Sequence, residues 1–143
     1  LVGSEMCIRD SHNNIQPPRT DLELTECVLD YHHKLSQDLE KMPLVLSVLG
    51  IGTDGHTASL FPGQINTKMT EMIVQPGGKG PEGLSRITLS HSLLLESKKI
   101  FFMANSDGKE SALEKAQSHT DINQYPLIPF LNSPQSYFYT QRS

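Results

Sequence analysis

The sequence has only two cysteines, Cys7 and Cys27, in 143 residues. Two thiols are too few for a disulfide framework and match no metal-ligand spacing, which argues against a disulfide-rich domain and a cysteine-bound metal. No apolar run approaches the ~18 residues of a membrane-spanning helix, so we expect no membrane partner. No segment resembles a charged and then apolar secretory leader either, and a cytoplasmic location is therefore expected.

Positive charge is scarce as well. The chain carries 12 Lys and Arg residues against 16 Asp and Glu residues, which gives a formal net charge of −4 at pH 7. This balance provides no electrostatic footprint for a nucleic acid, so a nucleic-acid partner is not expected. The length and the 36% hydrophobic content indicate one domain with a single core.

Hydrophobic periodicity predicts a long helix that begins at Thr20 or Asp21. Its apolar residues recur at steps of three and four and so share one face: Leu24, Val28, Tyr31, Leu35, Leu39 and Met42. Pro43 ends this helix, and residues 44–49 follow as a continuous apolar run of strand length. Because the run does not alternate, we expect a strand that is covered on both faces within a parallel sheet.

The rest of the chain repeats a pattern of strand, loop and helix that is typical of an α/β fold. The expected strands are Glu71–Val74, Arg86–Leu89, Lys99–Ala104 and Tyr137–Thr140. The expected helical segments are a turn that Pro62 closes, a turn through Leu93–Leu95 and a helix over Lys109–Ser118.

A glycine-rich loop directly follows the strand of residues 44–49, with Gly50, Gly52 and Gly55 in six residues. This position puts the loop at the carboxyl edge of a parallel sheet, where open α/β folds bind ligands. Glycines permit a positive φ and a close approach of backbone N–H groups to an anion. The loop lacks the spacing of dinucleotide and P-loop motifs, so no nucleotide cofactor is expected. On the glycines alone, a tight turn without a ligand is equally compatible.

His56 and Asp54 are the candidate catalytic residues of this loop. Histidine, with an ordinary pKa of about 6.5, can take and return a proton near neutral pH, and a carboxylate two residues away can fix its tautomer. The alternatives are a solvent-facing turn histidine and an Asx turn at Asp54. His32 and His33 point about 100° apart on the predicted helix and are unsuited to joint metal ligation. For His91, we expect a partly buried histidine with its hydrogen bond satisfied.

Three segments resemble the 6-phosphogluconolactonase family. Val48–Gly63 resembles its G-x-G-x-D-G-H-T-A-S-L-F-P-G signature, Arg86–Leu89 its R-I-T-L segment, and Gly108–Leu113 its G-K-x-x-x-L helix start. All three occur in the family's order, so the resemblance covers roughly residues 12–139. Related deaminases carry G-H-I-A-F-N-E-P where this chain has G-H-T-A-S-L-F-P over Gly55–Pro62.

The resemblance implies a Rossmann-like parallel sheet with helices on both faces, shared with glucosamine-6-phosphate deaminase and ribose-5-phosphate isomerase. Members of that fold are about twice as long, and the match is to their carboxyl half. We therefore expect residues 12–143 to be the carboxyl-terminal part of one truncated domain. The missing amino-terminal half would supply a phosphate-binding Ser/Gly/Thr loop and an arginine. Residues 1–11 resemble cloning-adapter read-through and are expected to be non-native.

The resemblance also implies hydrolysis of 6-phosphoglucono-1,5-lactone to 6-phosphogluconate in the oxidative pentose phosphate pathway. His56 would act as the general base, Asp54 would orient it, and backbone N–H groups of Gly50–Gly55 would stabilise the oxyanion. Arg86 and Lys109 would hold the 6-phosphate. A lactone is already a reactive ester, so neither a metal nor a cofactor is expected. The expected partner is a small sugar phosphate, and the oligomeric state is left open.

Three other functions remain open. The first is a sugar-phosphate-binding module without catalysis, and the second is a fragment with no function of its own. The third, glucosamine-6-phosphate deamination, is the least favoured. A binding module would be stabilised by 6-phosphogluconate but would release no acid from the lactone. A fragment would unfold in a broad, non-cooperative transition.

Overall fold

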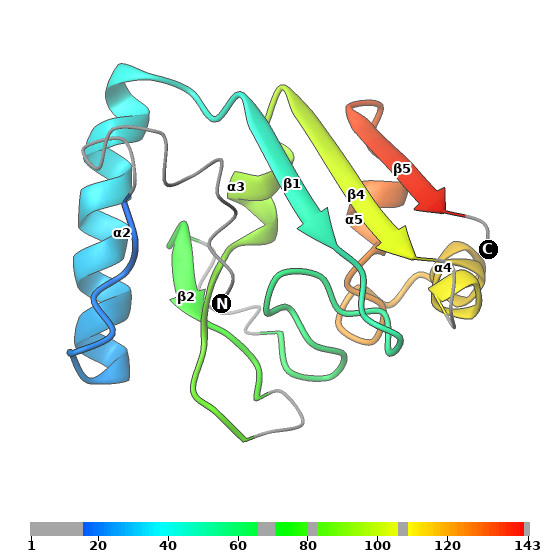
Figure 1. The fold of residues 1–143 in the computed structure, drawn as a ribbon, viewed down its shortest axis with the longest axis horizontal. Helices are drawn as coiled ribbons and strands as arrows, with labels where there is room; N and C mark the ends of the chain where they lie inside the picture. Colours follow the sequence, from blue (N-terminus) through cyan, green and yellow to red (C-terminus); the bar gives the residue numbers. More distant parts are fainter. Residues whose placement is uncertain (1–15, 66–70, 80–82, 106–108, 142–143) are drawn as a thin grey trace.

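The protein is described by a computed structural model that covers residues 16–65, 71–79, 83–105 and 109–141. Three of the described strands form a parallel sheet in the order β1-β4-β5. Their bounds are Leu46–Gly50 for β1, Lys99–Asn105 for β4 and Ser136–Gln141 for β5. The strands point in one direction, so their carboxyl ends meet at a single edge of the sheet (Figure 1). The predicted α/β fold with a parallel sheet is confirmed.

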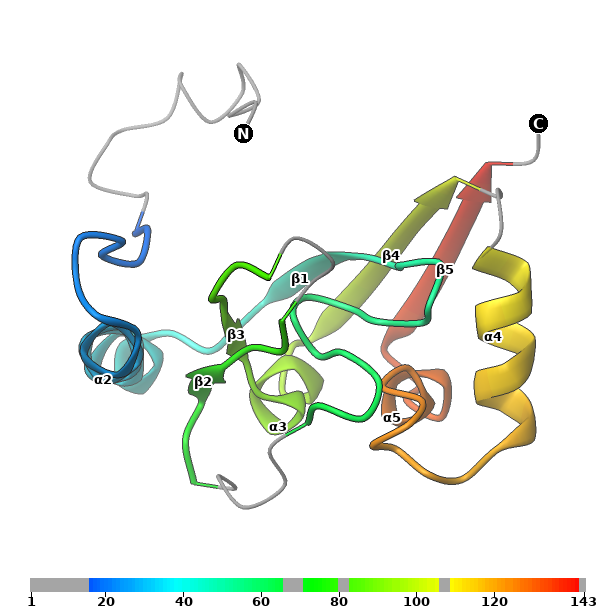
Figure 2. The same cartoon turned by 90° about the horizontal axis from the view of Figure 1, so that it is seen from below.

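One face of this sheet is covered by α3 (His91–Leu95), α4 (Lys109–Ser118) and α5 (Ile128–Leu131) (Figure 2). The core lies between this face and the helices. Phe102 of β4 is fully buried, stacked on Phe138 at 4.6 Å between ring centroids and edge-on to Phe130 at 5.3 Å. Aromatic pairs at these separations pack favourably and fix the sheet against the helix layer.

A second, two-stranded sheet lies beside the first. β2 (Val74–Pro76) and β3 (Ile87–Leu89) pair in antiparallel fashion. The long helix α2 (Leu24–Lys41) packs against β2, with Cys27 and Val28 buried, on the side away from the parallel sheet (Figure 1). Among the described helices, none has the length and apolar character needed to cross a membrane.

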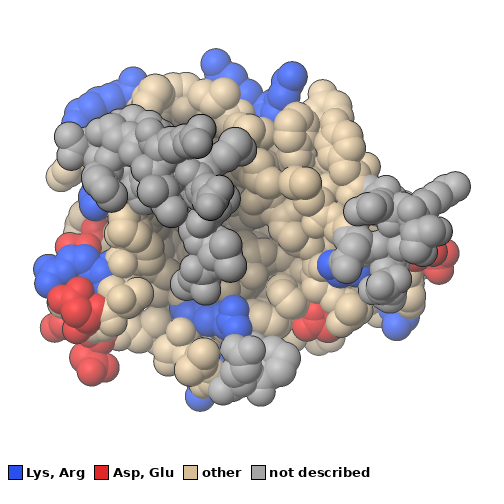
Figure 3. Space-filling view, viewed as in Figure 1, with Lys and Arg blue, Asp and Glu red and all other residues tan. Residues whose placement is uncertain are grey.

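The other face of the parallel sheet carries apolar side chains that remain exposed. They are Leu46, Val48, Met103, Tyr137 and Tyr139, each between 42% and 62% exposed. Ser47, whose side chain points to the opposite face, is buried. Few charged side chains lie over β1, β4 and β5 on this face (Figure 3). The expectation that β1 is covered on both faces is therefore wrong for the described residues, whose helices cover one face only.

Most predicted elements form, with shifted bounds. α4 has the predicted bounds, whereas α2 begins at Leu24, later than predicted, and β2 overlaps the expected strand only at Val74. The helical turn expected before Pro62 is absent from the described chain, because Thr57 and Leu60 form an isolated antiparallel bridge there. The short helix α5 was not predicted. Residues 1–11 lie outside the described residues.

We expect the exposed sheet face to limit the solubility of residues 1–143. The double variant Val48→Thr, Met103→Gln should have a higher solubility limit and bind less of a hydrophobic dye, because the two substitutions remove exposed apolar area. The free energy of unfolding should change by no more than about 0.5 kcal/mol per site, since both side chains face outward. Leu84→Gln, at a residue that is 60% exposed outside any strand, is the matched control. Equal gains from the control and the double variant would contradict the assignment.

Candidate active site

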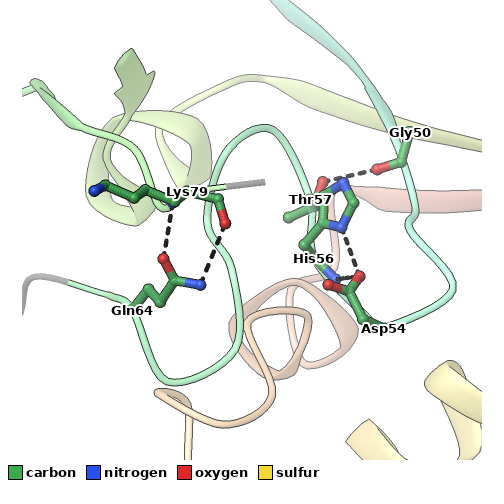
Figure 4. A network of polar contacts seen from close by, with 6 residues as sticks. All are labelled: Gly50, Asp54, His56, Thr57, Gln64 and Lys79. Carbon is green, nitrogen blue, oxygen red and sulfur yellow. Dashed lines mark hydrogen bonds and ion pairs between the residues drawn. The ribbon is translucent and has the colours of Figure 1, made fainter. Parts of the chain in front are cut away.

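The loop after β1 brings the two predicted catalytic side chains together. Nδ1 of His56 lies 2.5 Å from Oδ1 of Asp54, and the same oxygen accepts a hydrogen bond from the His56 backbone N–H at 3.1 Å (Figure 4). An ionised carboxylate only accepts hydrogen bonds, so Nδ1 is the donor in this contact, and in a neutral imidazole Nε2 then keeps its lone pair. The side chains are 31% and 50% exposed. The pair can therefore exchange protons with water.

Two positions of this loop favour glycine. A Cβ at Gly52 would lie 2.2 Å from Nδ1 of His56 and 2.7 Å from Oδ1 of Asp54, so both side chains would have to move. Gly55 has a φ of +86°, in the left-handed region that favours glycine. Gly50 shows neither constraint, because nothing lies within 4 Å of an added Cβ and its φ is not positive. Its carbonyl oxygen instead accepts a hydrogen bond from Thr57 Oγ1 at 3.0 Å.

The expected oxyanion donors are partly occupied. The N–H of Gly52 donates to the carbonyl oxygen of His56 at 2.9 Å, and the N–H of Gly55 donates to that of Gly52 at 3.0 Å. Both groups hold the loop closed on itself. The role of the loop's N–H groups toward a developing oxyanion stays a prediction.

A small hollow opens beside His56 at the carboxyl edge of the parallel sheet. It encloses about 210 Å³ and is lined by Gly50, Ile51, Gly52, His56 and Ala58. Ala58 has a φ of +50°, a strained value for a residue with a side chain. The hollow is smaller than the ~300–1,000 Å³ typical of small-molecule pockets. The hollow by itself is therefore small for a small-molecule site.

Arg86 and His56 contact the same aromatic ring. The imidazole of His56 lies 4.3 Å from the ring centroid of Phe61, and Cζ of Arg86 lies over the same ring at 5.9 Å. Arg86 immediately precedes β3, so it comes from the two-stranded sheet. The structure thus places a guanidinium and an imidazole around one phenyl ring. The phosphate-binding role of Arg86 stays a prediction.

Lys109 begins α4, which follows β4 in the chain. Ala112, one turn along α4, faces Gly55, where an added Cβ would contact its own Cβ at 3.7 Å. The first turn of α4 therefore packs against the glycine-rich loop, at the same sheet edge as His56. The role of Lys109 stays a prediction, and Gly108 of the resembling segment lies outside the described residues.

His91 is a partly buried histidine with its hydrogen bond satisfied, as expected. Its Nε2–H donates to the carbonyl oxygen of Pro126 at 2.9 Å, and its ring lies 5.5 Å from that of Phe130. Burial lowers the pKa of His91, although the hydrogen bond to Pro126 partly opposes this shift. Among the described residues, no three His, Cys, Asp or Glu side chains are grouped as a metal site would require.

The model of one protein family matches residues 4–136, and that family comprises the glucosamine-6-phosphate isomerases and 6-phosphogluconolactonase. The chain belongs to this family. The match extends into the segment 1–11, whose non-native origin stays a prediction.

Two members of the family are close in sequence. The chain is 36% identical to 6-phosphogluconolactonase of Rattus norvegicus over 98 residues, which cover 66% of this chain and 38% of the rat protein. It is 33% identical to the human 6-phosphogluconolactonase over 110 residues, or 74% of this chain and 43% of the human protein. The chain thus spans less than half the length of these curated relatives.

A solved structure of 6-phosphogluconolactonase from Plasmodium vivax has the same fold. It superposes with a TM-score of 0.74 at 23% identity and covers 86% of this chain and 54% of the Plasmodium chain. At this identity the likeness concerns the fold alone.

Sequence reasoning missed Phe61 and Ala58 as site residues. Both lie inside Val48–Gly63, the segment that resembles the family signature. Their membership of that segment was the available signal, but neither side chain carries a group that chemistry would single out. The contact of Phe61 with Arg86 joins residues 25 positions apart in the chain and depends on tertiary packing.

Gly52→Ala should displace His56 from Asp54. The added methyl group overlaps both side chains, so we expect the downfield NMR resonance of the His56 Nδ1–H to disappear, while stability changes little because both side chains are partly exposed and can move. Gly50→Ala is the matched control, because its added methyl group meets no neighbour. Retention of the resonance in Gly52→Ala, or its loss in Gly50→Ala, would contradict the steric explanation.

Acid should destabilise the fold through His91. Because burial lowers its folded-state pKa, the unfolded chain binds the proton first, so stability is lost as pH falls below about 6.5 toward the folded pKa. His91→Phe keeps an aromatic ring beside Phe130 but cannot titrate. Denaturant unfolding at pH 7.5 and 5.5 should therefore show a smaller pH effect in His91→Phe. His33→Phe, at an exposed residue of α2, should keep the full effect.

Proposed function

We propose that this protein hydrolyses 6-phosphoglucono-1,5-lactone to 6-phosphogluconate. The observation that carries the proposal is the Asp54–His56 pair, held at 2.5 Å beside a hollow at the carboxyl edge of a parallel sheet. Membership of the family limits the chemistry to sugar phosphates, and the relatives compared above are named 6-phosphogluconolactonases.

In the proposed reaction His56 acts first as a base. Nε2 takes a proton from water as the water oxygen bonds to the C1 carbonyl carbon, and the carbonyl oxygen becomes the oxyanion of a tetrahedral intermediate. When that intermediate collapses, the bond between C1 and the ring oxygen breaks, and the imidazolium returns its proton to the ring oxygen. Asp54 stabilises the imidazolium through Nδ1–H and keeps Nε2 available.

The phosphate is assigned to Arg86 and Lys109. A guanidinium is always charged and can bind a phosphate with two parallel hydrogen bonds. Lys109 begins a ten-residue helix, whose first N–H groups also favour an anion. The packing of α4 against Gly55 supports a place for Lys109 near the loop that carries His56. The contact of Arg86 with Phe61 supports the same for Arg86.

Two alternative activities are less well supported than lactone hydrolysis. The isomerase branch of the family is disfavoured by Thr57–Pro62, which differs from the deaminase segment, and by the names of the relatives. A binding module without catalysis would share the phosphate site but would not need the Asp54–His56 pair. A short contact between a carboxylate and an imidazole at an open site favours catalysis.

We further propose that residues 12–143 form the carboxyl-terminal part of one larger domain. The exposed apolar face of the parallel sheet and the small size of the hollow support this proposal, because additional chain would cover the face and complete the hollow. The proposed location is the cytoplasm, where the free thiol of Cys27 would stay reduced.

His56→Ala should lower kcat for the phosphorylated lactone by at least about 100-fold, because the variant has no general base. The binding of 6-phosphogluconate should stay largely intact, since the phosphate is held elsewhere. The assay follows acid release from fresh lactone by the complete polypeptide that carries this sequence, with thermal stabilisation by 6-phosphogluconate as the binding readout.

The control for this experiment is His33→Ala, which removes an exposed imidazole from α2. It should leave both turnover and binding unchanged. Unchanged turnover in His56→Ala would remove His56 from the mechanism. Binding of 6-phosphogluconate without any acid release from the unmodified protein would favour the binding module instead.

A further inference from the structure

Phe61 contacts both ends of the proposed site, although it has no reactive group. Its side chain is 4% exposed. The imidazole of His56 lies against its ring at 4.3 Å with an interplanar angle of 31°, and Cζ of Arg86 lies over the ring at 5.9 Å. A cation within about 6 Å of a ring centroid is attracted to the aromatic face. Phe61 is therefore in contact with both the imidazole and the guanidinium.

The backbone of residues 77–79 holds Phe61 in this place. A Cβ at Gly78 would lie 2.8 Å from Cδ2 and 2.9 Å from Cβ of Phe61, so the chain passes the ring at the closest approach that glycine allows. The N–H of Gly78 donates to the carbonyl oxygen of Ser59 at 2.9 Å. The neighbouring Lys79 N–H donates to Oε1 of Gln64 at 2.8 Å (Figure 4). These bonds attach the segment to both sides of Phe61 in the chain.

The same segment also fixes Arg86. The N–H of Gly77 donates to the carbonyl oxygen of Arg86 at 2.7 Å, and an added Cβ at Gly77 would lie 3.2 Å from Cβ of Arg86. Residues 77 and 78 thus touch Arg86 and Phe61 in succession. The backbone of Arg86 and the ring of Phe61 are therefore positioned by one short piece of chain.

We propose that Phe61 is a positioning residue that sets the separation of His56 from Arg86 and thereby the preference for a phosphorylated over an unphosphorylated lactone. The proposal rests on the proposed function. A substrate with a 6-phosphate must engage both groups at once, so a change in their separation misplaces its C1 carbonyl from Nε2. A lactone without the phosphate needs only His56 and is insensitive to that separation. Small misplacements of this kind can cost up to about 100-fold in rate.

The test compares kcat/KM for 6-phosphogluconolactone and for glucono-1,5-lactone in the complete polypeptide. Phe61→Leu should lower the ratio of the two values by at least about 10-fold, mainly through the phosphorylated substrate. Phe61→Tyr, which keeps the ring, should restore most of the ratio. Phe130→Leu removes a buried ring of the core that packs against His91 and Phe102, and it should leave the ratio unchanged. An unchanged ratio in a folded Phe61→Leu protein would overturn the proposal, as would a ratio that falls equally in Phe130→Leu.

Two further measurements keep the proposal falsifiable if Phe61→Leu does not fold. Gly78→Ala displaces the ring without removing it and should lower the same ratio. In the unmodified protein, nuclear Overhauser contacts should join the Phe61 ring to both the His56 imidazole and the Arg86 side chain, and their absence would overturn the proposal. If the unmodified protein hydrolyses neither lactone, the proposed function fails by itself. In that case the same variants are compared by the ratio of the dissociation constants of gluconate and 6-phosphogluconate in place of the kinetic ratio.

Discussion

The contact between His56 and Asp54 occupies the space that a side chain at residue 52 would take. A Cβ there would lie 2.2 Å from the imidazole nitrogen that Asp54 binds. The N–H of Gly52 also donates to the carbonyl oxygen of His56, so the same residue closes the loop and leaves room for the pair. The direction of β1 then determines where this loop lies, because β1 ends at Gly50 and the loop begins there, at the carboxyl edge of the parallel sheet. Local backbone sterics and sheet direction together produce an exposed, oriented imidazole.

The two faces of the parallel sheet differ in their energetic situation. On the covered face, Ile100 and Phe102 are fully buried. On the other face, Val48 and Met103 are more than half exposed. Full burial of such a side chain contributes about 1.5–3 kcal/mol, and the net stability of a domain is only about 5–15 kcal/mol. Burying a few of these exposed side chains would therefore raise the free energy of unfolding by a large fraction of its total.

Sequence patterns predicted the elements whose signals are local. The apolar runs of β1 and β4 and the period of α4 fixed their place and type, and a spacing of two residues brought Asp54 to His56. α5 was missed because Pro129 lies within its first turn, where proline is tolerated although it usually signals a loop. The cover of each sheet face and the ring contacts of Phe61 depend on residues far apart in the chain. No periodicity encodes those contacts.

The proposed site also depends on how the two sheets meet. His56 belongs to the loop that leaves the parallel sheet, whereas Arg86 precedes β3 of the antiparallel pair. Ser59 joins the two units, because its N–H donates to Thr88 Oγ1 at 3.2 Å and its carbonyl oxygen accepts from the Gly78 N–H at 2.9 Å. Neither sheet alone can set the separation of His56 from Arg86. The junction at Ser59 holds the two sheets together, and Phe61, two residues further along the chain, contacts His56 and Arg86 across it. The proposed site therefore needs both the loop that ends at Gly63 and the segment that begins at Arg86.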